Sequence, residues 1–174
     1  MHGYLCALSA ARAAQLDAEP GRLFDVIGLR GGAASGVLDL GKAWDALDIL
    51  LSDRGGDRLL GDAVLARSGK PMKAAGAYGP ASYLPPARVA RIAATLGKLP
   101  AGRVRERYGA LYGKNVHGGY GQEICAADEL KFIRDKVAAI QRAEIAALEA
   151  AVKKLKEFYS GAAKAGDGVM AVVV

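Results

Sequence analysis

The segment Gly166-Asp-Gly-Val-Met-Ala-Val-Val-Val174 follows a stretch from Gln122 to Ser160 that contains neither glycine nor proline. A long stretch without helix breakers favours a helix. A short, continuous apolar run after a glycine is typical of a strand that is buried on both faces. We therefore predict that a long C-terminal helix leads into an interior strand of a sheet.

The length of this helix limits how it can pack. Its apolar pattern runs from about Ala126 to Ala163, interrupted only at Glu144. A straight helix of that extent would measure roughly 55 Å, whereas a compact chain of this length has a diameter of about 40 Å. The helix is therefore expected to kink near residues 142–144, to project, or to pack against a second subunit in a homodimer. A helix that lies across the sheet is the arrangement we prefer.

The N-terminal segment has the pattern of a strand followed by a helix. Tyr4-Leu-Cys-Ala-Leu8 alternates as a short strand does, and Ser9 is a suitable N-cap for a helix that continues to about Asp17. Residues 23–29 form a second short helix or strand. The glycine-rich loop that follows, residues 28–36, lacks the spacing of a nucleotide-binding motif.

Residues 39–51 predict the clearest helix in the first half of the chain, with Asp39 as its N-cap. The only tryptophan, Trp44, shares one face of this helix with three leucines and is therefore expected in the core. The polar side chains of the helix are expected to face water, and these are Lys42, Asp45 and Asp48.

Further elements are predicted in the middle of the chain. Residues 59–66 form a short apolar element, and loops are expected at 69–71 and 76–80 because glycine and proline gather there. A helix is expected to begin at Pro85-Pro86, since proline fits the first turn of a helix. Another short helix is expected over residues 101–108.

Composition places the chain among ordinary globular proteins. Its 174 residues are 52% hydrophobic and 24% charged, which is enough for one domain spanning residues 1–174. The two cysteines, Cys6 and Cys125, form no framework of disulfides and no metal-ligand spacing. A signal peptide and a membrane-spanning segment are both absent from the pattern. The sequence therefore predicts a soluble, cytoplasmic protein without a metal or cofactor.

Positive charge is concentrated in the middle third of the chain. The net charge is +6, and no acidic residue lies between Asp62 and Glu106. A basic segment of this kind can face phosphate, nucleic acid or an acidic protein, although it can also be an ordinary solvated surface. Arg103 and Arg107 lie one helical turn apart, a spacing that permits two guanidinium groups to clamp an anion. Within residues 63–105, the other candidates for anion binding are Arg88 and Arg91.

A second candidate region is the loop Tyr112-Gly-Lys-Asn-Val-His-Gly-Gly-Tyr-Gly-Gln-Glu123. Its side chains suit general acid and base chemistry if His117, Glu123 and either Tyr112 or Tyr120 converge. A nucleophilic serine or cysteine is missing from any recognisable spacing. An ordinary surface loop is the simpler interpretation.

Three segments together resemble a known family. Residues 38–51 contain Lys-x-Trp-x-x-Leu, residues 83–89 read Tyr-Leu-Pro-Pro-Ala-Arg-Val, and residues 158–169 lead from the long helix to the last strand. In this order they resemble the YfbM-like family of bacterial proteins, the domain of unknown function DUF1877. The resemblance implies a single α+β domain with a small mixed sheet that includes both terminal strands. It implies no reaction, and it implies packing roles for three residues, Lys42, Trp44 and Tyr83.

Three functions remain open at this point. The first is a non-enzymatic protein that binds an unknown protein partner. The second is a protein that binds an anion or a nucleic acid through residues 63–105. The third is a hydrolase or transferase that uses the loop at 112–123. We favour them in that order, because motifs for metal, nucleotide and triad chemistry are missing from the sequence.

Overall fold

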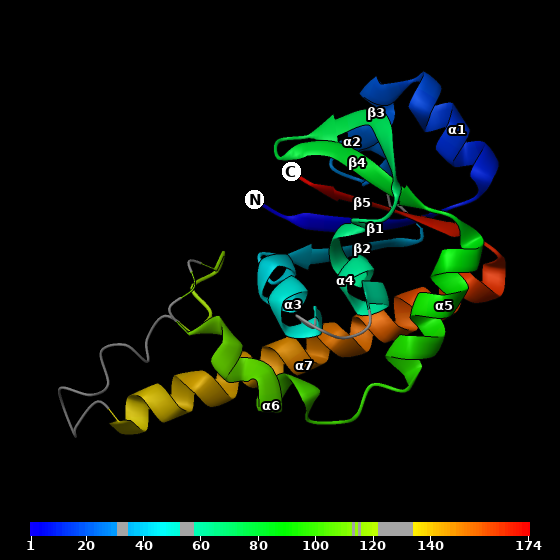
Figure 1. The fold of residues 1–174 in the computed structure, drawn as a ribbon. Coiled ribbons are helices and arrows are strands. Elements are labelled where there is room, and N and C mark those ends of the chain that lie inside the picture. Colours follow the sequence, from blue (N-terminus) through cyan, green and yellow to red (C-terminus); the bar gives the residue numbers. More distant parts are fainter. Residues whose placement is uncertain (31–34, 53–57, 113, 115, 122–133) are drawn as a thin grey trace.

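The apolar segment near the C-terminus forms the central strand of a five-stranded sheet (Figure 1). The computed structural model describes residues 1–30, 35–52, 58–112, 114, 116–121 and 134–174. The strand order is β2-β1-β5-β4-β3. The bounds of the strands are β1 Gly3–Leu8, β2 Val37–Gly41, β3 Lys70–Gly76, β4 Gly79–Leu84 and β5 Gly168–Val173.

Strand β5 is buried on both faces, as the valine run predicted. All six of its residues are buried. Because side chains alternate along a strand, Val169, Ala171 and Val173 enter the core on one face of the sheet. Met170 and Val172 enter a second core on the other face. The prediction of an interior strand is confirmed.

Every strand pair in the described sheet is antiparallel. The resemblance implied a mixed sheet, and in this detail the expectation was wrong. Strands β1 and β4 do run in the same direction, because both pair antiparallel with β5. Since β5 lies between them, they do not form a parallel pair. The α+β class and the single domain are as expected.

Helices cover both faces of the sheet (Figure 1). On one face lie α1 (Ala10–Ala18) and α2 (Leu23–Val26), joined by the 3-10 turn η1 (Pro20–Arg22). The predicted cap of α1 is present, since Ser9 Oγ accepts a hydrogen bond from the backbone N–H of Arg12 at 3.3 Å. The other face carries α3 (Trp44–Leu51), α4 (Arg58–Leu65), α5 (Pro86–Gly97), α6 (Arg103–Arg107), the 3-10 turn η2 (Tyr108–Leu111) and α7 (Arg134–Ala165).

The long helix is continuous wherever the structure describes it. Helix α7 spans 32 residues, which corresponds to about 48 Å, and it passes residues 142–144 without a break. It runs beneath α3, α4 and α5, and its N-terminal end extends beyond the sheet (Figure 1). Its buried side chains join the core of those helices, among them Leu148, Leu155 and Tyr159. Residues 126–133 of the predicted helix lie outside the described residues.

The segment around Asp39 was assigned wrongly. We expected a helix over 39–51, but residues 37–41 form the edge strand β2, and Asp39 Oδ1 accepts the N–H of Gly41 at 2.6 Å in the turn that follows. Trp44 is buried as predicted. Asp48 is buried as well, although we expected it to face water. It lies one turn after Trp44, so both side chains share the inner face of α3, and Asp48 forms an ion pair with Arg67.

The β3–β4 hairpin was not predicted. Its alternation is present, with Met72 and Ala74 buried and Lys73 and Ala75 exposed. Alanine and lysine are weak strand formers, so this pattern is easy to miss. Pro71 lies in β3, which is an edge strand, where a missing N–H is tolerated. None of the helices in the described residues combines the length and apolar character needed to cross a bilayer.

Candidate functional site

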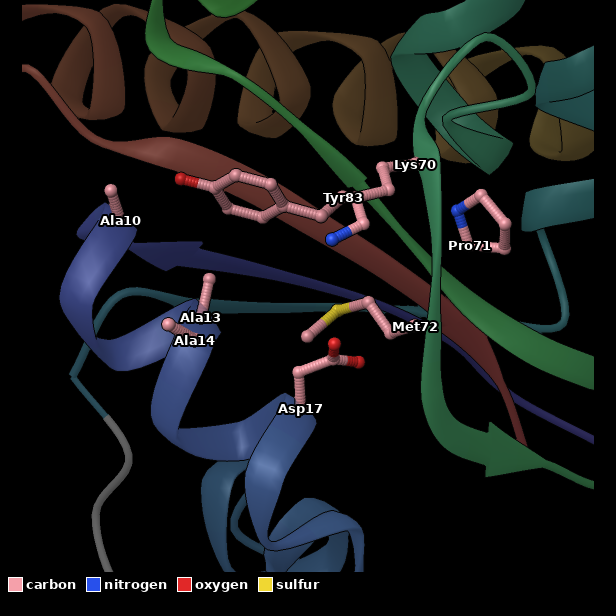
Figure 2. Close-up of a pocket in the computed structure, with 8 residues that line it drawn as sticks. All are labelled: Ala10, Ala13, Ala14, Asp17, Lys70, Pro71, Met72 and Tyr83. Atoms are coloured by element: carbon pink, nitrogen blue, oxygen red, sulfur yellow. The ribbon is translucent and has the colours of Figure 1, made fainter.

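A first cavity, the α1–β3 slot, lies between helix α1 and strands β3 and β4 and has a volume of about 190 Å³ (Figure 2). Helix α1 and the β3–β4 hairpin form its walls. Helix α1 supplies three alanines and a carboxylate, while the hairpin supplies an amine, a thioether and a phenol. These residues are Ala10, Ala13, Ala14, Asp17, Lys70, Met72 and Tyr83, and Pro71 of β3 completes the lining.

Only some of the polar groups of the α1–β3 slot form hydrogen bonds within the protein. Asp17 Oδ1 accepts the backbone N–H of Lys73 at 2.7 Å, which ties α1 to β3. The Lys70 amine forms no hydrogen bond or ion pair with any residue that the structure describes. The Tyr83 hydroxyl lies 3.4 Å from the Leu8 carbonyl and donates to it. Burial, together with the nearby Asp167 carboxylate, raises the pKa of Tyr83, so the phenol stays protonated at neutral pH.

Gly168 gives the Tyr83 ring its place in the slot. A Cβ at this position would overlap the Tyr83 phenol and would lie 2.5 Å from the Leu84 carbonyl oxygen. Only a residue without a side chain therefore lets the ring lie across the start of β5. Tyr83 and Gly168 both belong to segments that resemble the family, and their close approach brings these two distant segments together in space.

A second cavity, the α6–α7 cavity, lies between the α5–α6 connection and helix α7 and has a volume of about 310 Å³. Aliphatic side chains form its walls, among them Leu99, Val104 and Val152. Its charged lining residues are Arg103, Lys153, Lys156 and Glu149. Lys156 is held in place because its Nζ donates to the Leu99 carbonyl at 2.9 Å. The cavity therefore combines an apolar wall with an excess of positive charge.

The four arginines considered for anion binding are not gathered on one face. Arg103 lines the α6–α7 cavity. Arg107 is not among the lining residues of this cavity, and its Nη2 donates to the Ser52 carbonyl at 3.0 Å. Arg88 is bound to Asp62, with Nε 2.9 Å from Oδ2. Arg91 is exposed on α5.

His117 has a partner that the sequence did not indicate. Its Nδ1 lies 2.9 Å from Asp45 Oδ2, and its backbone N–H donates to the same oxygen at 3.3 Å. Because a carboxylate only accepts, the neutral ring carries its proton on Nδ1 and leaves Nε2 as the basic nitrogen. The ring stacks on Trp44 at 5.4 Å and meets the edge of Tyr78 at 6.4 Å.

Tyr112 of the predicted catalytic loop is bonded to helix α7 and not to His117. The Tyr112 hydroxyl accepts a hydrogen bond from Gln141 Nε2 at 3.1 Å, on helix α7. Gly121 N–H donates to Glu144 at 3.1 Å, so this end of the loop is also tied to α7. Glu123 lies outside the described residues. Within the described residues, no group of three or more His, Cys, Asp or Glu side chains has the arrangement of a metal site.

Comparison with known proteins identifies the family. The family model described as domain of unknown function DUF1877 matches residues 1–172. The chain belongs to this family. Among solved structures, this DUF1877 member resembles YfbM from Escherichia coli, itself a protein of unknown function, with a TM-score of 0.68 and 19% sequence identity. The likeness covers 100% of both chains and shows a shared fold. The comparison with curated proteins found no match.

The side chains that line the two cavities of this DUF1877 member were mostly missed by sequence reasoning. Asp17 and Lys70 come from elements 53 positions apart and carry no motif. Lys153 and Lys156 lie three residues apart on a helix rich in both charges, so their pattern resembles an ordinary exposed face. Among the charged residues of the α6–α7 cavity, only Arg103 had been considered, as one half of an anion clamp with Arg107. For the α1–β3 slot, the one indication in the sequence was Tyr83, which belongs to a family-like segment and lines the slot.

Proposed function

We propose that this protein is a non-enzymatic binding protein that takes an acidic segment of a partner protein into the α6–α7 cavity. The observation that carries the proposal is the composition of this cavity, in which three cationic side chains and one carboxylate surround an apolar floor. Carboxylates of a partner are expected to pair with the cations while its apolar side chains cover the floor.

The shape of the neighbouring surface supports an extended partner over a small ion. A shallow hollow of about 800 Å³ continues from the cavity along α5 and α7, and Lys156 lines both. The hollow is lined mainly by small residues, including Ala93, Gly97 and Gly161. Small residues allow the backbone of a bound segment to approach closely, so a helix or strand fits there better than an isolated anion.

Electrostatic attraction supplies the expected specificity. The chain carries a net charge of +6, and charge complementarity at a partly exposed surface accelerates association and weakens as salt is added. An acidic partner is therefore favoured over a neutral or basic one. The carboxylates of such a partner could then pair with Arg103, Lys153 and Lys156, which line the same cavity.

The proposal is tested by fluorescence anisotropy with a fluorescein-labelled peptide of alternating glutamate and leucine. We expect saturable binding that weakens between about 50 and 200 mM salt. Lys153→Glu should weaken binding by about tenfold or more, which corresponds to about 1.4 kcal/mol. Lys73→Glu is the matched control, because it makes the same change of charge at an exposed position of strand β3, and it should have little effect.

Two results would contradict this function. Equal losses in Lys153→Glu and Lys73→Glu would mean that the peptide responds to net charge and not to the cavity. Tight binding of a single-stranded oligonucleotide that Lys153→Glu abolishes, with no binding of the acidic peptide, would favour the nucleic-acid function instead.

A further inference from the structure

The α1–β3 slot presents opposite charges to the same small space. In Figure 2 the Lys70 amine enters from β3, and the Asp17 carboxylate rises from α1 toward Met72. No ion pair joins the two groups, and each is a residue that the structure describes. Asp17 uses one oxygen for the N–H of Lys73, so its second oxygen is available to a ligand. The slot therefore holds a cation and an anion that do not neutralise each other.

Apolar groups line the open space between these two charged groups. The methyl groups of Ala10 and Ala13 come from α1, and the Met72 side chain faces them from β3 (Figure 2). The Tyr83 ring closes a third side. Methionine adapts its shape to different apolar partners, so this wall is suited to a short aliphatic side chain.

Size restricts the ligand further. The volume of the slot is about 190 Å³. Pockets for drug-sized ligands and nucleotides usually measure about 300 Å³ or more, so the slot is too small for them. Lys70 is exposed, so the group that pairs with it lies at the mouth of the slot. The ligand must then be a small molecule that carries a negative group, a positive group and an apolar part.

We propose that the α1–β3 slot binds a free aliphatic α-amino acid, with the ligand carboxylate on Lys70, its ammonium group on Asp17, and its side chain against Ala13 and Met72. This binding site is separate from the α6–α7 cavity and does not depend on the function proposed for that cavity. The Tyr83 hydroxyl lies at the top of the slot and can donate to the ligand when it leaves the long contact with the Leu8 carbonyl.

The experiment is a titration of the full chain with L-leucine, followed by isothermal calorimetry and by the amide resonances of the protein. We expect a dissociation constant in the range of about 0.1–1 mM, because the site is small and open. The amide of Lys73 should shift, since its N–H is bound to the Asp17 carboxylate that receives the ammonium group. Leucinamide and 4-methylpentanoate each lack one charge, and both should bind at least about tenfold more weakly.

Variants separate the two ends of the ligand. Lys70→Gln should weaken L-leucine binding by about tenfold or more and leave the binding of leucinamide unchanged, whereas Lys70→Arg should retain most of the affinity for L-leucine. Lys98→Gln, an exposed lysine at the end of α5, is the control for loss of one positive charge. Thermal unfolding confirms that each variant is folded.

Four outcomes would overturn the proposal, and the first three concern affinity. One is the absence of L-leucine binding at 10 mM, which is roughly ten times the weakest expected dissociation constant. Another is equal affinity for L-leucine and leucinamide. A third is an equal loss of L-leucine affinity in Lys70→Gln and Lys98→Gln. Shifts confined to residues of the α6–α7 cavity would also overturn it, because the ligand would then occupy the other site.

Discussion

Replacing Gly168 with alanine is expected to lower the free energy of unfolding by about 3 kcal/mol or more, because the new methyl group has no space. Its carbon would lie 2.5 Å from the Leu84 carbonyl oxygen and would overlap the Tyr83 phenol. The phenol can move, but the carbonyl belongs to β4, which is paired with β5 at this point. The strand pair must therefore separate locally to accept the substitution.

Chemical denaturation and thermal unfolding measure this effect. For a chain of this length, 3 kcal/mol corresponds to a fall of roughly 6–12 °C in Tm. Gly161→Ala is the matched control, since a Cβ at this position of α7 meets no atom within 4 Å. That variant should be stabilised by about 0.5–1 kcal/mol, because alanine favours the helix more than glycine does. Similar effects of the two substitutions would contradict the tight packing of Tyr83 on β5.

Asp62→Asn is expected to cost about 3 kcal/mol at pH 7, because it removes the negative partner of a buried ion pair. Asp62 is buried on α4 and accepts from Arg88 on α5, and it also accepts from the N–H and hydroxyl of Ser68. Burial raises the pKa of Asp62, but the hydrogen bonds from Ser68 and Arg88 outweigh it and leave the pKa below its ordinary value. Asparagine retains part of this hydrogen bonding and loses the charge.

The pH dependence of this variant has a definite sign. A carboxyl group whose pKa is lowered by folding stabilises the fold above its ordinary pKa, near 4, and loses this contribution as the pH falls through the lower folded value. The difference in stability between the wild type and Asp62→Asn should thus be constant above about pH 5 and shrink below pH 4. Denaturant titrations at several pH values measure it.

Asp48→Asn provides a comparison with the opposite trend. Burial raises the pKa of Asp48, and the bond from Arg67 offsets this only in part. The charged form therefore opposes folding at neutral pH. This penalty begins to shrink as the pH falls through the raised pKa, and it is gone below the ordinary pKa, near 4. Asp48→Asn should be neutral or stabilising at pH 7, with its advantage lost in acid. Parallel pH profiles for the two variants would contradict these assignments.

The parts of the fold that could be predicted have strong local signals. The valine run of β5, the cap at Ser9 and the proline entry of α5 each rest on a few adjacent residues. The misassigned segment at 39–43 fails for a physical reason, since Leu38 and Leu40 fit a strand as well as they fit a helix, and only pairing with β1 decides between them. Asp48 looked solvent-facing because its partner, Arg67, belongs to another element.

Candidate sites were harder to predict than the fold. His117 was named as a candidate for acid and base chemistry together with Glu123, but its carboxylate partner is Asp45, which lies 72 positions away. Arg88 was named as a binding residue because of its charge, and the structure places it against Asp62. Pairings of this kind depend on which helices pack together, so the spacing of charges along one segment does not reveal them.

The position of β5 has a consequence for how the chain folds during synthesis. The pairs β1–β2 and β3–β4 both precede β5 in the sequence, yet no strand of one pair is paired with a strand of the other, because β5 lies between them. As the chain leaves the ribosome, the two halves must wait for residues 168–173 before they can join. The nascent chain would thus expose the apolar edges of β1 and β4 until translation passes this segment, an interval in which chaperones have the greatest opportunity to act.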